Sequence, residues 1–153
     1  MTPSELERVY DVAPAIVWDA LVDPVLLEGW LGRVSAPLTE GAHVVIQWLD
    51  PHHEGSTVTR VARAAPEQAL ELAGDIAVVF RLEATPGGPR GTRTRLRVDV
   101  PGAPAEGRAH AAAHLEALAD LLHGHPVVWE RWDDDYAAFT ASVLSRPSDG
   151  TTR

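Results

Sequence analysis

Segment 92–100 reads Thr-Arg-Thr-Arg-Leu-Arg-Val-Asp-Val, a strict alternation of two kinds of side chain. Leu96, Val98 and Val100 share one parity with Thr94, and the charged residues take the other. Successive side chains of a strand point to opposite faces, so this pattern predicts a strand with one buried and one solvated face. Antiparallel sheets are built this way. The chain must therefore supply an apolar element that covers the buried face.

That element follows directly in the sequence. The run from Pro101 to Pro104 interrupts the strand, and a helix is predicted from about Gly107 to His123. Its apolar residues recur at spacings of four, three and four, which places them in one stripe. The stripe consists of Ala111, Leu115, Leu118 and Leu122. Gly124 and Pro126 end the helix.

Short apolar runs between turn residues predict the rest of the sheet. These strands cover Leu6–Val12, Val44–Leu49, Thr57–Ala64, Gln68–Ala73 and Ile76–Ala84. Pro66-Glu67 joins one pair of strands, and Gly74-Asp75 predicts a two-residue hairpin turn. Pro14 and Pro24 begin two short helices after the first strand, and Gly32 is expected to end the second.

The fold class is therefore α+β. We expect a curved antiparallel sheet of about six strands around a long C-terminal helix, with two short helices after the first strand. The length of 153 residues suits one domain. We expect residues 1–145 to form it, and polar residues 146–153 to be a disordered tail.

Composition excludes several classes. The net charge of -9 argues against nucleic acid and membrane surfaces as partners. The absence of cysteine excludes disulfides and thiolate sites and suits a reducing cytoplasm, which is the predicted location. No apolar run approaches the ~20 residues of a membrane span. The polar start, with Glu5 and Glu7, is unlike a signal peptide.

The block from Arg8 to Pro24, RVYDVAPAIVWDALVDP, together with Trp30-Leu-Gly32, resembles the opening of a known family. The family is that of bacterial proteins related to the activator of the heat-shock protein 90 ATPase. It belongs to the SRPBCC superfamily, also called START-like or Bet v 1-like. Most of residues 6–124 take part in the resemblance. Its later parts are Gly55–Val58 with Pro66 and Leu70, Val79–Leu82 with Gly91-Thr92, and Leu115, Leu118, Leu122 and Gly124.

The resemblance implies a helix-grip fold with an internal cavity between the sheet and the closing helix. Family members often carry Gly-Trp early in that helix, where this chain has His110-Ala111. Losing a tryptophan there would widen or reshape the space beneath the helix. One fold hosts many functions, so the resemblance implies little about chemistry.

The predicted roles of Trp18, Trp30 and Trp48 differ. Trp18 lies in the first short helix and is expected to pack in the core. Trp30 lies near the expected cavity mouth and is interpreted equally well as a packing residue or a ligand contact. Trp48 faces inward if Val44 and Ile46 do, and outward if the strand is shifted by one residue.

The inner faces of the strands supply the candidate ligand-binding residues. Ordinary core and cavity wall both require apolar side chains, so composition does not separate the two. The predicted set is Trp30, Ile46, Trp48, Leu70, Leu72, Val78, Phe80, Leu82, Leu96, His114 and Leu118. Ile76 shares the parity of Val78 and Phe80.

The remaining motifs have plain structural interpretations. His110 and His114 have the spacing of two metal ligands on a helix, but a third ligand is not evident, so no metal is predicted. His114 adjoins the leucine stripe and can present a polar group to a ligand, whereas His52-His53 is expected in a solvated loop. Of the arginines at positions 90, 93, 95 and 97, three are expected on the solvated face of one strand, which is favoured over a nucleic-acid site.

The C-terminal part of the chain has two notable features. Asp133–Asp135 suits an exposed turn or a helix start that divides the last helical segment. Around it, aromatic residues recur at helical spacing and predict either packing on the body or a partner surface. These residues are Trp129, Trp132, Tyr136, Phe139 and Val143.

Three functions are carried forward, in this order. The first is a non-catalytic binder of a small apolar or aromatic molecule such as a lipid or polyketide, for transport or for self-resistance to an antibiotic. The second is a polyketide cyclase- or aromatase-like enzyme, whose proton transfer would rest on His114, His43 or Glu71. The third is a module that docks on a chaperone.

No catalytic motif or cofactor fingerprint is present, so neither a catalytic residue nor a cofactor is predicted. The protein is expected as a monomer or homodimer, with a cavity on the order of 300–1,000 Å³.

Overall fold

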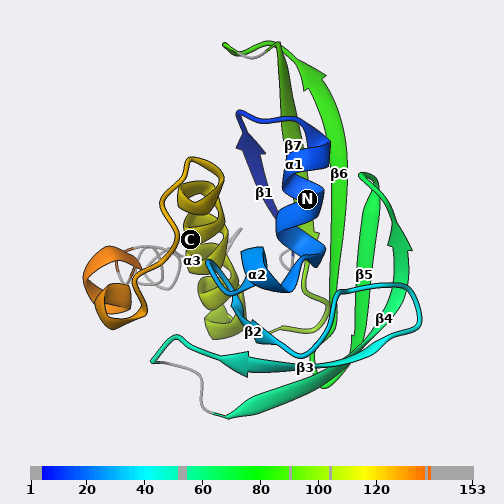
Figure 1. Cartoon of the computed structure of the whole chain (residues 1–153), viewed down its shortest axis with the longest axis vertical. Coiled ribbons are helices and arrows are strands. Elements are labelled where there is room, and N and C mark those ends of the chain that lie inside the picture. The colour runs from blue at the N-terminus through cyan, green and yellow to red at the C-terminus, as the bar shows by residue number, and fades with distance from the viewer. Residues whose placement is uncertain (1–4, 52–54, 90, 104, 137, 139–153) are drawn as a thin grey trace, which may run out of the picture.

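The computed structural model describes residues 5–51, 55–89, 91–103, 105–136 and 138 (Figure 1). In this part of the chain, seven strands form one antiparallel sheet in the order β1-β7-β6-β5-β4-β3-β2. The strands are β1 (Glu5–Tyr10), β2 (Gly32–Val34), β3 (His43–Trp48), β4 (Ser56–Ala65), β5 (Ala69–Gly74), β6 (Val78–Pro86) and β7 (Thr92–Asp99). The helices are α1 (Pro14–Val22), α2 (Pro24–Leu27), α3 (Ala105–Leu122) and the 3-10 turn η1 (Trp129–Arg131). The predicted α+β, helix-grip class is confirmed.

Strand β7 shows the alternation predicted from its sequence. It pairs with β1 on one side and β6 on the other, so that Leu96 lies opposite Arg8 and Leu82. Thr94, Leu96 and Val98 are buried, while Arg93 and Arg97 are exposed. The buried face of β7 therefore belongs to the inner side of the sheet.

Strand β2 was not predicted from the sequence, and the expectation for Gly32 was wrong. Helix α2 ends at Leu27, and Gly32 begins β2 opposite Trp48. A Cβ atom at Gly32 would lie only 2.7 Å from the main-chain oxygen of Gln47. Glycine is needed here because β2 approaches β3 closely. The sheet therefore has seven strands in the described residues, where about six were expected.

The connection between β5 and β6 is longer than the predicted two-residue turn. The last pair between these strands is Leu72 with Val78. Ala73 and Gly74 instead continue the ladder with β4, where Gly74 lies opposite Thr59. Ile76 is consequently in the connection rather than in β6. By contrast, the predicted turn at Pro66-Glu67 is present, with Gln68 N donating to Ala65 O at 2.9 Å.

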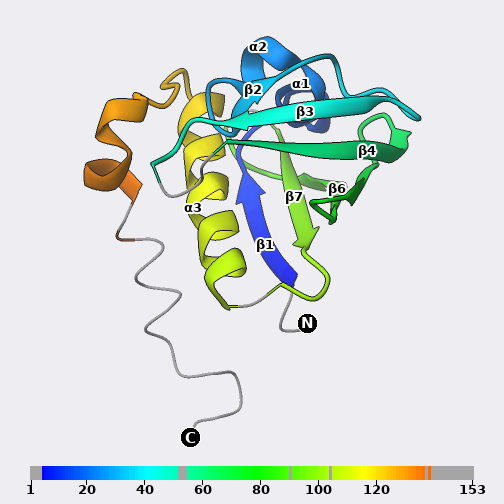
Figure 2. The same ribbon diagram turned by 90° about the horizontal axis from the view of Figure 1, so that it is seen from below.

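The sheet curls around α3, which lies against its concave side (Figures 1 and 2). A bulge between Val61 and Arg63 bends β4, and such a bend helps an antiparallel sheet to curve. Helix α1 packs against α3, β6 and β7. One hydrophobic core joins the inner face of the sheet to the three helices.

The segment after α3 packs on the side of that helix away from the sheet (Figures 1 and 2). Trp132 and Tyr136 are buried there, and residues 132–136 are helical. Asp133–Asp135 therefore lies within a helix and does not break it, contrary to one sequence expectation. Phe139, Val143 and the predicted tail 146–153 lie outside the described residues, so the extent of the single domain stays a prediction.

Candidate functional site: a cavity beneath helix α3

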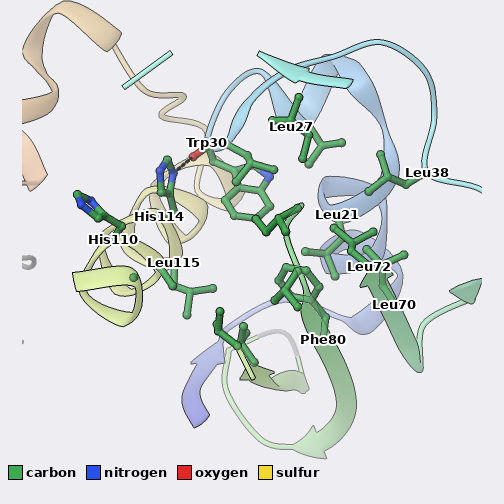
Figure 3. A pocket seen from close by; sticks show the side chains of 18 of the residues that line it. Leu21, Leu27, Trp30, Leu38, Leu70, Leu72, Phe80, His110, His114 and Leu115 are labelled. Atoms are coloured by element: carbon green, nitrogen blue, oxygen red, sulfur yellow. Dashed lines mark hydrogen bonds between the residues drawn. The ribbon is translucent and has the colours of Figure 1, made fainter. Parts of the chain in front are cut away.

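A partly enclosed cavity of about 220 Å³ lies between α3, the inner face of the sheet and the α1–α2–β2 segment (Figure 3). Most of its lining is aliphatic or aromatic. The lining residues are Leu21, Leu27, Trp30, Leu31, Leu38, Ile46, Trp48, Leu70, Leu72, Ile76, Val78, Phe80, Val98, Val100, Gly107, His110, Ala111, His114 and Leu115. The volume is below the expected range of about 300–1,000 Å³.

The small side chains of α3 keep this space open. Gly107 and Ala111 are one helical turn apart and both line the cavity, whereas the next residue on the same helix face is the larger Leu115. A side chain larger than methyl at 107 or 111 would project toward the sheet. The resemblance indicated the same position, because members of that family often carry a tryptophan where this chain has Ala111.

The cavity has a buried end and a more exposed end. Leu21, Leu27, Ile46 and Leu70 are each about 1% exposed and form the deep wall. The side chains at the other end are only partly buried. They are Trp48, Ile76, Val100, His110 and Ala111. These residues belong to β3, to the connections after β5 and β7, and to the N-terminal half of α3.

Neither tryptophan on the wall offers its ring N–H to the cavity. Trp30 Nε1 donates to the main-chain oxygen of Ala20 at 2.8 Å. Trp48 Nε1 donates to Thr57 Oγ1 at 2.7 Å. Trp48 also resolves the register question, because it lies on the inner face with Val44 and Ile46. Both rings therefore present apolar surface to the cavity.

The polar side chains of the wall are histidines of α3. His114 Nδ1 lies 2.8 Å from the main-chain oxygen of Trp30, an interaction drawn in Figure 3. Its Nε2 lies 3.3 Å from Asp50 Oδ1. The Asp50 side chain has no exposed surface and that of His114 is 6% exposed. The ring is therefore fixed between α2–β2 and the end of β3.

The main-chain partner of His114 determines the role of one ring nitrogen. A main-chain carbonyl only accepts, so Nδ1 of His114 carries a hydrogen. Nε2 faces the buried carboxylate of Asp50, which does not line the cavity.

An aromatic group from the C-terminal segment covers His114 on its outer side. The Trp132 ring centroid is 4.7 Å from that of His114 and 4.8 Å from that of Tyr136. Trp129 stacks on Trp132 at 5.5 Å and donates from Nε1 to Glu28 O at 3.1 Å. The predicted packing of this aromatic stripe on the body is therefore observed for its described members.

Eight of the eleven predicted site residues line the cavity: Trp30, Ile46, Trp48, Leu70, Leu72, Val78, Phe80 and His114. Whether they bind a ligand stays a prediction. Leu82, Leu96 and Leu118 do not line it and are buried core residues instead. Leu82 and Leu96 face each other in the β6–β7 ladder, and Leu118 lies one turn beyond the end of the cavity.

The predicted set of site residues left out Gly107, Ala111 and Asp50. The resemblance had indicated that Ala111 widens the space beneath the helix, and Gly107 could have been added because it lies one turn before Ala111 on the same helix face. Asp50 follows the predicted strand 44–49 and carried no signal, since an aspartate before a proline is an ordinary loop residue.

The arginines of β7 face outward and are paired with carboxylates. Arg93 contacts Asp11 at 3.3 Å, and Arg97 contacts Glu7 at 3.4 Å. Arg95 lies 3.3 Å from Glu83. These pairs give the strand a mixed surface charge, as the solvated-face interpretation predicted.

Two kinds of site are absent from the described residues. No three histidine, aspartate or glutamate side chains come together there in a way that would hold a metal ion. No helix in the same part of the chain combines the length and apolarity needed to cross a bilayer. His52 and His53 lie outside the described residues.

Comparison with known proteins supports the fold. The sequence matches no protein-family model, and no curated protein matches it either. Among solved structures, DynU16, from the dynemicin biosynthetic locus, is similar with a TM-score of 0.62 and 24% identity. That match covers 80% of this chain and 48% of DynU16, so the chain spans about half of that relative.

Two other similar structures are covered over most of their length. CalU16 from Micromonospora echinospora has a TM-score of 0.58 at 18% identity, over 93% of this chain and 88% of that one. The protein encoded by BPP1335 from Bordetella parapertussis has a TM-score of 0.64 at 18% identity, over 93% and 84%. At these identities the likeness concerns the fold alone, and that fold is the curled antiparallel sheet closed by a helix.

Proposed function

We propose that this chain is an SRPBCC-type binding protein that holds a small, uncharged, ring-containing molecule in the cavity beneath α3. The observation that carries the proposal is the apolar cavity of about 220 Å³ in an otherwise continuous core. Native cores contain few voids larger than a water molecule, so a space of this size is unusual for a scaffold.

The size of the cavity suggests the size of the ligand. An engineered apolar cavity of roughly 150 Å³ binds benzene. A space of about 220 Å³ therefore suits a molecule of about two fused rings. Larger natural products would require α3 or its neighbours to move. Binding would be driven by burial of apolar surface, at ~25 cal/mol per Å².

The dynemicin-locus relative gives limited support for a natural-product ligand, with sequestration or transport as the purpose. Docking on a chaperone rests on the sequence resemblance alone and ranks last. The cytoplasmic location, the monomeric or dimeric state and the absence of nucleic-acid partners remain proposals from charge and composition.

Calorimetric titration with indane, a two-ring hydrocarbon, tests the binding proposal directly. We expect saturable binding at one site. The Ala111→Phe variant should lose this binding because the added ring occupies the cavity. Ala105→Phe is the control, since Ala105 lies on the same helix, is exposed and does not line the cavity. Absence of indane binding to the unmodified protein, or equal binding by both variants, would refute the proposal.

A proton-transfer enzyme is the second candidate, because His114 lies on the wall beside a buried carboxylate. It ranks lower because Nδ1 of His114 is already bonded to the Trp30 carbonyl and Nε2 faces Asp50, which does not line the cavity. Exchange of deuterium into 2-indanone, followed by proton NMR, tests it. Exchange that is faster with the protein and is lost in His114→Ala would favour the enzyme. Exchange at the buffer rate would exclude it for this class of ketone.

A further inference from the structure

We infer that the bound molecule is an amphiphile whose polar substituents all lie on one edge, and that this edge stays at the partly exposed end of the cavity. The inference rests on the proposed function and adds the chemical class of the ligand and its orientation. The opposite edge of the molecule is bare hydrocarbon and lies against the deep wall, to which α1 and α2 contribute Leu21 and Leu27.

The polar groups nearest the deep wall already have partners within the protein. The side chains of this wall are aliphatic. The main chain of Ile46 is paired with β2 and β4, and that of Leu70 with β4 and β6. Trp30 Nε1 donates to Ala20 O at 2.8 Å. A hydroxyl buried against this wall would lose its water without gaining an equivalent hydrogen bond, which weakens binding.

The other end of the cavity lies where one edge of the sheet meets the N-terminal half of α3. Strands β3, β5 and β7 end there and β4 and β6 begin there, because neighbouring strands are antiparallel. Trp48 at the end of β3, Ile76 after β5 and Val100 after β7 line the cavity and are only partly buried. Figure 3 shows His110, also partly buried, on the side of the pocket opposite Leu70. Water can therefore reach a polar substituent at this end.

The difference between the two ends limits the ligand class more sharply than volume does. Two fused rings fill a cavity of about 220 Å³, so polar groups on opposite edges of such a molecule cannot both stay at the partly exposed end. One of them would be buried against aliphatic side chains. Polar groups gathered on one edge keep their hydration while the rings bury their apolar surface.

Two isomers of dihydroxynaphthalene test this orientation by calorimetry on the unmodified protein. The 2,3-isomer carries both hydroxyls on one edge, whereas the 2,6-isomer carries one on each of two opposite edges. We expect the 2,3-isomer to bind at least about tenfold more tightly after correction for octanol–water partition, because one hydroxyl of the 2,6-isomer is desolvated without a partner. Naphthalene and 2-naphthol should both bind.

Failure of the inference and failure of the proposed function give different results. If naphthalene binds but the 2,3-isomer does not, or if the 2,6-isomer binds as tightly as the 2,3-isomer, the inference is overturned and the apolar site stands. If neither naphthalene nor 2-naphthol binds, the proposed function itself is wrong. These outcomes need only the unmodified protein, so they do not depend on whether a variant folds.

A charge placed at Val100 locates the polar edge, with 2-naphthoate as a charged probe. Val100→Lys should bind 2-naphthoate at least about fivefold more tightly than Val100→Glu at low salt, because the carboxylate lies near position 100. The two variants should not differ in their affinity for naphthalene. Val45→Lys and Val45→Glu are the matched controls, since Val45 is exposed on the outer face of β3 and does not line the cavity. No difference at Val100, or an equal difference at Val45, would overturn the orientation.

Discussion

The phenol of Tyr10, on β1, donates a hydrogen bond to the main-chain oxygen of Leu115, on α3, across 2.9 Å. This bond joins the first strand to the helix that roofs the cavity, and the side chain of Leu115 lines that cavity. Arg8 and Glu116 form a second link between the same elements at 2.8 Å. Two polar contacts thus join α3, the helix that covers the cavity, to strand β1 of the sheet.

Replacing Tyr10 by phenylalanine should destabilise the protein modestly. The variant keeps the buried ring and loses one buried hydrogen bond, which costs about 1 kcal/mol. The Leu115 carbonyl lies within the α-helix, so its helical bond remains and limits the loss. Urea unfolding followed by circular dichroism measures the change, and an unchanged midpoint would contradict the role assigned to this bond.

Alkaline pH should weaken the fold through its buried phenols. Burial raises the pKa of Tyr10 well above its ordinary value, with a further upward contribution from Glu116 against a lowering one from Arg8. Burial, followed by the hydrogen bond that Tyr136 donates to Asp120 at 2.6 Å, raises the pKa of Tyr136. Both groups hold their protons more tightly when folded, so their contribution is present below pH ~10 and is lost as pH rises above it.

Urea midpoints measured from pH 8 to pH 11.5 test this pH dependence. The unmodified protein should lose stability above pH ~10, where the unfolded phenols ionise. The doubly substituted Tyr10→Phe, Tyr136→Phe protein should show a flatter profile. If the urea midpoints of the two proteins fall in parallel as pH rises, groups other than Tyr10 and Tyr136 cause the loss of stability at alkaline pH.

Leu118→Ala should cost more stability than Leu115→Ala. The two leucines lie on the same helix and both are at most 2% exposed. Leu118 packs in the core away from the cavity, whereas Leu115 borders empty space and so has fewer atoms to lose contact with. We expect Leu118→Ala near the upper part of the usual ~2–5 kcal/mol range and Leu115→Ala near the lower part. Equal losses would indicate that the cavity is filled in solution.

Trp132→Ala should destabilise the protein more than Trp129→Ala. Trp132 is 1% exposed and contacts His114, Trp129 and Tyr136, so its truncation is expected to cost about 3–5 kcal/mol. Trp129 is partly exposed and should cost less. Thermal unfolding of the two variants gives the comparison. A small decrease in the unfolding temperature of Trp132→Ala would mean that the C-terminal segment does not stabilise α3.

The sequence by itself determined the elements whose buried face can be read from the spacing of their apolar residues. The alternation in β7 fixed its inner face, and the leucine spacing in α3 fixed the side that faces the sheet, since both patterns depend only on backbone geometry. Prolines 14 and 24 marked the two short helices, because proline suits the first helical position.

Only the tertiary structure decided which inner residues border a cavity and which simply pack. Leu82, Leu96 and Leu118 have the same apolar character as Leu70 and Leu72, and their difference depends on how closely α3 approaches each part of the sheet. Asp50 and His114 are 64 positions apart in the sequence, and no local pattern reports that they meet. Local residue preferences act over a few positions, whereas cavities and buried polar pairs arise where distant segments come together.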